Sequence, residues 1–83
     1  MKILWFAWFR ARVGTSEEIV DLPAHVRDVQ GLIAWLRTRS PGHAAALKEI
    51  SVVRVAVNQE YVKLDHPLKA SDEVALFPPV TGG

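Results

Sequence analysis

The sequence contains no cysteine and a single methionine, Met1. The lack of cysteine excludes disulfides, thiol catalysis and cysteine-ligated metal sites. No apolar run approaches the roughly 20 residues that a membrane helix requires. Lysine and arginine are spread along the chain, whereas a nucleic-acid surface gathers them into a basic block with interleaved aromatics. We therefore expect neither a membrane nor a nucleic acid among the partners.

The side chains also lack the patterns of self-sufficient catalysis. The three histidines, His25, His43 and His66, show no metal-ligand spacing. No glycine-rich loop precedes a helix, and no serine stands in a nucleophile elbow. Adjacent carboxylates at 17–18 and 72–73 would face opposite ways on a strand, so we interpret them as solvated surface. We expect no metal, no bound cofactor and no enzymatic activity of the chain on its own.

The length and composition of the chain indicate one small globular domain. The chain has 83 residues and a formal net charge of +1, and 49% of its residues are hydrophobic against 23% charged. A domain of this size buries about 60–65% of the surface of its unfolded chain, which leaves one modest core. The apolar start, MKILWFAWF, is too short for a signal peptide and lacks a cleavage site. A cytoplasmic location is the default expectation.

The N-terminal third predicts a β-hairpin. The β-branched and aromatic run at 2–9, KILWFAWF, is typical of a strand. Residues 10–16 include Gly14 and predict a turn. Residues 17–22 can return as a second strand, which Pro23 ends.

A helix follows. Apolar residues recur at i, i+3, i+4 and i+7, the spacing that places them on one helical face: Val29, Leu32, Ile33 and Leu36. Asp28 is a good N-cap. Arg37 and Arg39 would lie in the last turn, where cations suit the helix dipole, and residues 40–42 would end the helix. Residues 43–50 could form a second, short helix.

The C-terminal part predicts three strands, at 52–57, 61–64 and 73–77. The first two are joined by a tight turn at 58–60 that opens on an asparagine, and Pro78 ends the last. The element order β-β-α-(α)-β-β-β predicts an α+β fold, with a mixed sheet of about five strands and one main helix on one face. We place the domain at 1–78 and an extended tail at 79–83.

One face of this sheet is too apolar to be exposed to solvent. Strand alternation assigns Val53, Val55 and Val57, with Val74 and Leu76, to the face under the helix. The first strand is apolar on both faces. The outer face would then carry Phe6, Trp8, Tyr61 and Phe77, or the first-strand residues of the opposite parity. An exposed aromatic patch on a small domain indicates a protein partner, although the short helix or a loop could instead cover it.

The chain finishes on LFPPVTGG. Glycine has no Cβ, so Gly82 and Gly83 could thread a narrow tunnel in another protein. Pro78 and Pro79 favour an extended backbone, and the five residues after Pro78 could reach roughly 15 Å. The remaining reactive group is the α-carboxylate of Gly83. A partner holding ATP could convert it to an acyl adenylate, and sulfide could displace AMP to give a thiocarboxylate.

Several segments resemble the small, sulfur-carrying subunits of molybdopterin synthases. They are F-A-x-x-R-x-x-x-G at 6–14, AVNQEYV at 56–62, DHPL at 65–68 and DEVALFPPVTGG at 72–83. The similarity spans nearly the whole chain and is weakest at 23–51. Ala11 departs from the family, which often has an acidic residue there. So does Trp8, where smaller or polar residues are common.

The resemblance implies a ubiquitin-like β-grasp fold and a carrier function. An ATP-dependent, E1-like enzyme would adenylate Gly83, and a sulfur-donating enzyme would supply the thiocarboxylate sulfur. The carrier would then transfer sulfur to precursor Z to form the dithiolene of molybdopterin, within a heterotetramer of two large and two small subunits. The large subunit would receive the tail, Pro78, Pro79, Val80, Thr81 and Gly82, and Phe6, Tyr61 and Phe77 match the apolar contact positions of the family. We add Trp8 and Arg10 to the residues expected to bind the partner.

Two alternatives share the fold and the Gly-Gly end. One is a carrier for thiamin thiazole synthesis or tRNA thiolation. The other is a ubiquitin-like modifier, which would form an isopeptide bond with lysines of a target protein.

Overall fold

The computed structural model describes residues 1–79 and confirms a mixed sheet of five strands. The sheet order is β2-β1-β5-β3-β4. Only β1 and β5 run parallel; the other neighbours are antiparallel. The strands are β1 (Lys2–Trp5), β2 (Glu17–Ile19), β3 (Arg54–Val57), β4 (Glu60–Val62) and β5 (Glu73–Phe77). The prediction for β5 is confirmed in both bounds, while β2 and β4 are shorter than expected.

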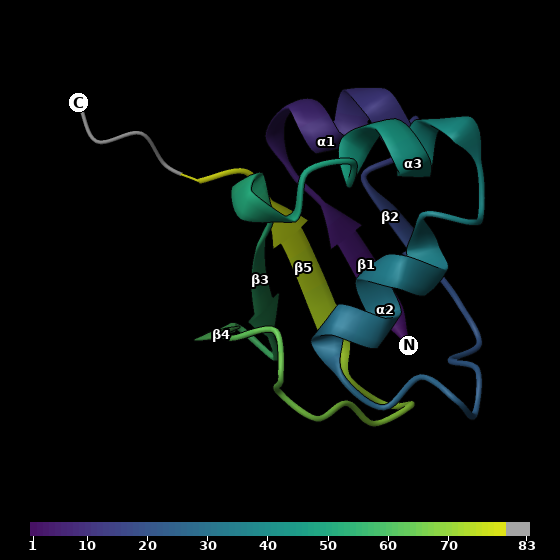
Figure 1. Cartoon of the computed structure of the whole chain (residues 1–83), viewed down its shortest axis with the longest axis vertical. Coiled ribbons are helices and arrows are strands. Elements are labelled where there is room, and N and C mark those ends of the chain that lie inside the picture. The colour runs from purple at the N-terminus through teal and green to yellow at the C-terminus, as the bar shows by residue number, and fades with distance from the viewer. Residues whose placement is uncertain (80–83) are drawn as a thin grey trace.

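In the part of the chain that the structure describes, three short helices accompany the sheet: α1 (Ala7–Val13), α2 (Val29–Leu36) and α3 (Pro41–Ala46). A 3₁₀ turn, η1, spans Ile50–Val52. Figure 1 shows α2 lying across one face of the sheet, with α1 and α3 side by side at the end where β1 and β5 terminate. Within residues 1–79, no helix is long and apolar enough to cross a membrane.

The prediction of one strand over 2–9 is wrong. β1 ends at Trp5, and α1 begins at Ala7, which has a positive φ of 55°. The sequence predicts a turn at 10–16, but most of this segment belongs to α1. The helix is capped at its C-terminus by Gly14, whose φ of 94° is left-handed. An apolar run of this length fits strand and helix alike, and tertiary packing decides between them. β1 and β2 do pair antiparallel, but a helix joins them.

The central helix is confirmed. Asp28 caps α2, and its Oδ1 accepts a hydrogen bond from the Gly31 backbone N–H at 2.8 Å. The placement of Arg37 and Arg39 in the last turn is wrong, because α2 ends at Leu36. Arg37 instead donates from Nε to the Leu47 carbonyl oxygen at 2.7 Å, which ties the connection after α2 to the end of α3.

The segment 40–42 begins α3, whereas the sequence indicated that it ends α2. Ser40 is the N-cap, and its hydroxyl accepts from the His43 backbone N–H at 3.1 Å. A Cβ on Gly42 would lie 2.2 Å from the Arg12 carbonyl oxygen, so only glycine allows α3 to approach α1 this closely. The expected helix at 43–50 therefore starts earlier and ends at Ala46, and β3 starts after η1.

The core lies between α2 and the inner face of the sheet. The four residues of the apolar stripe of α2, Val29, Leu32, Ile33 and Leu36, are fully buried, and so are the inward residues of β1 and β5. Val53, Val55 and Val57 face the same way, as strand alternation predicted. Burying such a side chain stabilises the fold by about 1.5–3 kcal/mol. The cluster includes Ile3, Trp5, Phe9, Val29, Leu32, Ile33, Leu36, Leu47, Val55, Val57, Val74 and Leu76.

A two-residue turn joins β3 to β4. Asn58 and Gln59 both have positive φ, 51° and 70°, as a type I′ hairpin turn requires. Asparagine tolerates this conformation, as the sequence indicated, whereas glutamine does so poorly. The Asn58 side chain also bonds Asp72 and the Glu73 backbone N–H, which fixes the turn against the start of β5.

We expect Gln59→Gly to stabilise the protein. Glycine adopts positive φ without the steric cost of roughly 1 kcal/mol that a side chain meets there. For a domain of this size, that corresponds to a rise in Tm of about 4–8 °C. Gln59→Ala is the matched control because it shortens the side chain but keeps the steric cost. Equal Tm values for the two variants in thermal denaturation would contradict this account of the turn.

Candidate functional site

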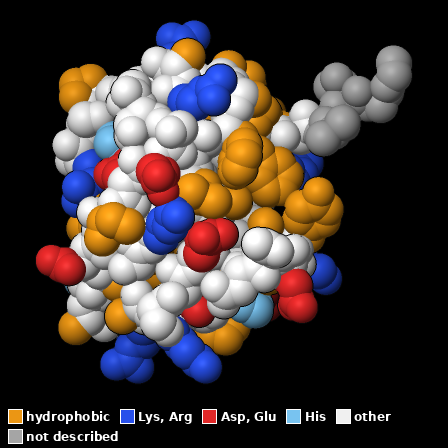
Figure 2. Space-filling view, turned by 180° about the vertical axis from the view of Figure 1, so that it is seen from behind, with side chains coloured by type: hydrophobic (Ala, Val, Ile, Leu, Met, Phe, Trp, Pro, Cys, Tyr) orange, Lys and Arg blue, Asp and Glu red, His pale blue; other side chains and the backbone are white. Residues whose placement is uncertain are grey.

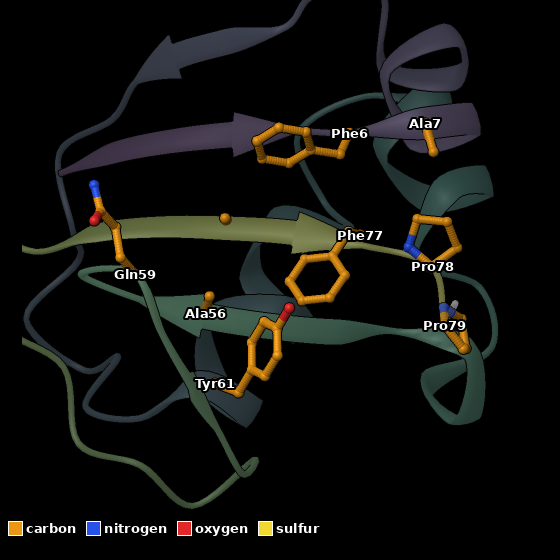
Figure 3. A pocket seen from close by; sticks show the side chains of 9 residues that line it. Phe6, Ala7, Ala56, Gln59, Tyr61, Phe77, Pro78 and Pro79 are labelled. Atoms are coloured by element: carbon orange, nitrogen blue, oxygen red, sulfur yellow. The ribbon is translucent and has the colours of Figure 1, made fainter. Parts of the chain in front are cut away.

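The outer face of the sheet carries an apolar groove of about 600 Å³. Figure 3 shows its aromatic side chains around the strand ends, beside the two prolines that follow β5. It is lined by Phe6, Ala7, Ala56, Gln59, Tyr61, Ala75, Phe77, Pro78 and Pro79. We call this surface the apolar groove.

The groove is concave because small and large residues alternate across the strand register. Ala56 pairs with Ala75 on one side and with Tyr61 on the other, so two alanines form the floor. The rings of Tyr61 and Phe77 lie 5.6 Å apart and form one wall. Phe6, at the end of β1, forms the opposite wall. A flat sheet face thereby becomes a hollow that a complementary protein surface can fill.

The aromatic side chains of the groove are exposed or half-buried. Tyr61 is 84% exposed and Phe6 is 48% exposed, and Phe77 is half-buried. Seen from this side, the largest gathering of hydrophobic side chains lies at the right of the view, and smaller groups are scattered elsewhere (Figure 2). Large apolar residues gathered like this mark a protein-binding surface. The described lining includes no ionisable side chain other than the Tyr61 phenol, so the groove suits binding rather than acid–base catalysis.

The structure brings together most of the residues predicted for partner binding. Phe6, Tyr61 and Phe77 line the apolar groove together with Pro78 and Pro79. Trp8 does not join them; it lines a separate hollow on the other side of α1. Arg10 is exposed on α1 and lines neither hollow. The tail residues predicted to enter the partner, Val80, Thr81, Gly82 and Gly83, lie outside the described residues.

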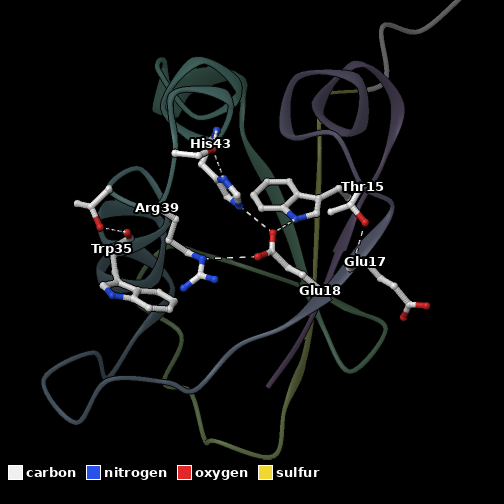
Figure 4. A network of polar contacts seen from close by, with 9 residues as sticks. Thr15, Glu17, Glu18, Trp35, Arg39 and His43 are labelled. Atoms are coloured by element: carbon white, nitrogen blue, oxygen red, sulfur yellow. Dashed lines mark hydrogen bonds and ion pairs between the residues drawn. The ribbon is translucent and has the colours of Figure 1, made fainter.

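The sequence did not reveal a polar network on the inner face, centred on Glu18. Its Oε2 accepts from Trp5 Nε1 at 2.8 Å and from His43 Nε2 at 2.7 Å (Figure 4). The guanidinium of Arg39 lies 3.5 Å from Oε1. The hydroxyl of Ser40 lies 2.7 Å from His43 Nδ1 and completes the chain.

The interpretation of Glu18 as solvated surface is therefore wrong. Its side chain is only 16% exposed, and it links β2 to α3 and to the core residue Trp5. Burial alone would raise the pKa of Glu18, but hydrogen bonds from His43 and Trp5, with the charges of His43 and Arg39, lower it below its ordinary value. Strand alternation held part of the signal, since Glu18 shares the parity of Val20, which is buried, and the structure pairs Glu18 with buried Ile3. The neighbouring Glu17 does lie at the surface, where it pairs with Lys2.

No group of three or more potential metal ligands occurs among residues 1–79. The described part of the site is a binding surface beside the diproline.

The fold is a ubiquitin-like β-grasp. Three features define it: the order of the strands, the parallel pairing of β1 with β5, and the helix α2 across one face of the sheet. The model of the ThiS family matches residues 3–83. The molybdopterin synthase sulfur carrier subunit of Escherichia coli (strain K12) is 44% identical over 85 residues, covering 100% of this chain and 99% of that protein. The subunit of the same name from Homo sapiens is 34% identical and covers 100% and 93%. The chain belongs to the ThiS family, and these full-length relatives are sulfur carrier subunits of molybdopterin synthase.

Solved structures support the same placement. A putative molybdopterin converting factor, subunit 1, from Pyrococcus furiosus superposes with a TM-score of 0.78 at 37% identity, covering 95% of each chain. The small archaeal modifier protein 1 (SAMP1) of Methanosarcina acetivorans superposes with a TM-score of 0.71 at 27% identity, covering 99% of this chain and 94% of that one. Carriers and modifiers thus share this fold.

Proposed function

We propose that the chain is the sulfur carrier of a molybdopterin synthase, with the Gly83 carboxylate as its reactive group. An E1-like enzyme would use ATP to form the glycyl adenylate, and a sulfur-donating enzyme would convert it to the thiocarboxylate. The large synthase subunit would then bind the apolar groove, receive the tail, and direct sulfur to precursor Z. On this proposal the chain binds no cofactor of its own and works in the cytoplasm.

The observation that carries the proposal is the position of the apolar groove beside the diproline. Pro78 and Pro79 line the groove, so a protein seated on Phe77 and Tyr61 also lies next to the base of the tail. Proline at the base limits the directions in which the tail can leave, and this reduces the entropy lost when the tail enters a partner. Among the described residues, the groove lining supplies no ionisable side chain apart from the Tyr61 phenol, which fits a carrier whose catalytic groups come from its partner.

The second candidate is a protein modifier, favoured by the likeness to small archaeal modifier protein 1. Both functions begin with the same activated glycine. They differ in the acceptor, because a carrier passes sulfur to a small molecule and a modifier forms an isopeptide with a lysine. The relatives at 44% and 34% identity favour the carrier.

We expect co-expression with the activating enzyme and a sulfur source to raise the intact mass by the difference between sulfur and oxygen. Tandem mass spectrometry should place the change on Gly83. The product, mixed with the large subunit and precursor Z, should yield molybdopterin. A variant lacking Gly82 and Gly83 is the control and should give neither result.

An unchanged mass in the presence of a competent activating enzyme would contradict the carrier chemistry. A thiocarboxylate that yields no molybdopterin would favour a carrier of a sibling pathway. Covalent adducts on lysines of other proteins, without molybdopterin, would favour the modifier.

A further inference from the structure

A second hollow, of about 460 Å³, lies on the other side of α1 from the apolar groove. Its lining combines an aromatic wall, a small apolar floor and a charged rim. Trp8 and Arg12 come from α1, and the rest come from α3 and the segment after it. The lining residues are Trp8, Arg12, Ala45, Ala46, Lys48, Glu49 and Val52. We call it the Trp8 hollow.

Exposure of the apolar Trp8 ring to solvent is energetically unfavourable. Its side chain is 44% exposed, and its ring stands edge-on to buried Phe9 at 4.4 Å between centroids. This contact holds the indole against the core, so little side-chain entropy remains to be lost when a partner binds. Rigid tryptophans beside hollows are typical anchors of protein interfaces.

The rim of the hollow favours carboxylates. Arg12 lies one helical turn after Trp8 on the same side of α1, and Lys48 follows α3. Neither cation forms an ion pair with any residue in 1–79. Glu49 is the only acidic residue in the part of the lining that the structure describes, so these residues carry one excess positive charge. Its floor of Ala45, Ala46 and Val52 accepts an apolar side chain.

The two hollows are neighbours across a single helix. Ala7 lines the apolar groove, and the next residue, Trp8, lines the Trp8 hollow. A protein surface seated on Phe6 and Phe77 meets Trp8 once it passes over the start of α1. One partner can therefore cover both.

We propose that the protein covering the apolar groove also fills the Trp8 hollow, with an apolar side chain flanked by carboxylates. This inference rests on the proposed function, which makes the large synthase subunit that protein. The hollow adds affinity through Trp8 and orientation through Arg12 and Lys48, because opposite charges at a rim steer docking and fix its register.

The test is isothermal titration calorimetry of the carrier with the large synthase subunit at low and high salt. Trp8→Ala should weaken binding at least about tenfold, as loss of an interface anchor does. Trp8→Phe should recover most of it. Lys48→Glu should weaken binding and flatten the salt dependence. Lys69→Glu, an exposed charge reversal away from both hollows, is the control and should bind normally.

Phe77→Asp separates this inference from the proposed function. If Phe77→Asp loses binding while Trp8→Ala and Lys48→Glu bind normally, the groove is the interface and the Trp8 hollow is not part of it. If Phe77→Asp, Trp8→Ala and Lys48→Glu all bind the large subunit normally, the docking face of the proposed function is also wrong. Weakened binding of Trp8→Ala to the activating enzyme alone would likewise overturn the assignment to the large subunit. Circular dichroism of each variant checks that the fold is retained.

Discussion

Phe77→Asp should lower the affinity for the large synthase subunit by at least about 30-fold. Phe77 stands in the wall of the apolar groove with Tyr61 and directly precedes the diproline. A carboxylate there would be desolvated in the complex without a partner charge, and losing an aromatic anchor at the centre of an interface costs 2 kcal/mol or more, roughly 30-fold in Kd. Calorimetric titration with the large subunit measures the effect.

The isolated domain should tolerate this change. Phe77 is half-buried and faces away from α2, so its replacement removes no residue of the core. Thermal denaturation followed by circular dichroism should therefore remain cooperative. Ala34→Asp introduces the same charge at an exposed position of α2, on the opposite face of the sheet, and should bind normally. Unchanged affinity of Phe77→Asp would show that the partner uses another face.

Glu18→Ala should cause the largest loss of stability among exchanges of polar residues. The exchange leaves the Trp5 Nε1–H and the His43 Nε2 without their acceptor inside a nearly closed site, and Arg39 loses its counter-charge. Removing one member of such a network costs about 2–4 kcal/mol. The Tm should fall on the order of 10–20 °C. Glu17→Ala is the control, because that exposed carboxylate makes only a surface pair, and its Tm should hardly change.

The contribution of Glu18 should depend on pH in a defined direction. Its pKa in the folded protein lies below the ordinary value, against the effect of burial, because of hydrogen bonds from His43 and Trp5 and the charges of His43 and Arg39. A carboxyl with a lowered pKa stabilises the fold above its unfolded pKa of about 4.3, and this stability is lost as pH falls through the folded pKa.

Urea denaturation at several pH values measures this dependence. The stability gap between the unsubstituted protein and Glu18→Gln should narrow as the pH falls below about 4.3. Glutamine keeps the shape and one acceptor but cannot ionise. A gap that stays constant through the acidic range would contradict an ionised Glu18 at the centre of the network.

The central helix was predictable because local signals agreed. The apolar spacing of Val29, Leu32, Ile33 and Leu36 and the Asp28 cap point to the same element, and the structure contains both. Strand alternation likewise placed Val55 and Val57 inward and Tyr61 and Phe77 outward. These are properties of neighbours in sequence, which short-range geometry determines.

The α1 helix was not predictable by the same reasoning. Residues 3–9 are all apolar, so neither the two-residue period of a strand nor the 3.6-residue period of a helix stands out. Nothing local marks Trp5 as the end of the strand. The close approach of Gly42 to the Arg12 carbonyl shows that packing against α3 defines this segment. The Trp8 hollow depends on that packing as well, and Trp8 would otherwise stand on a strand beside Phe6.

The sequence by itself determined the class of fold, the apolar stripe of α2, the outward aromatics and the Gly-Gly tail that marks the family. These follow from residue types and from spacings within one element. Only the tertiary structure decided that Ala56 and Ala75 meet as the floor of a groove, and that Glu18 and His43, 25 positions apart, share a hydrogen bond. Strand order and helix packing create such contacts between distant residues, and no local pattern encodes which distant partner a residue will meet.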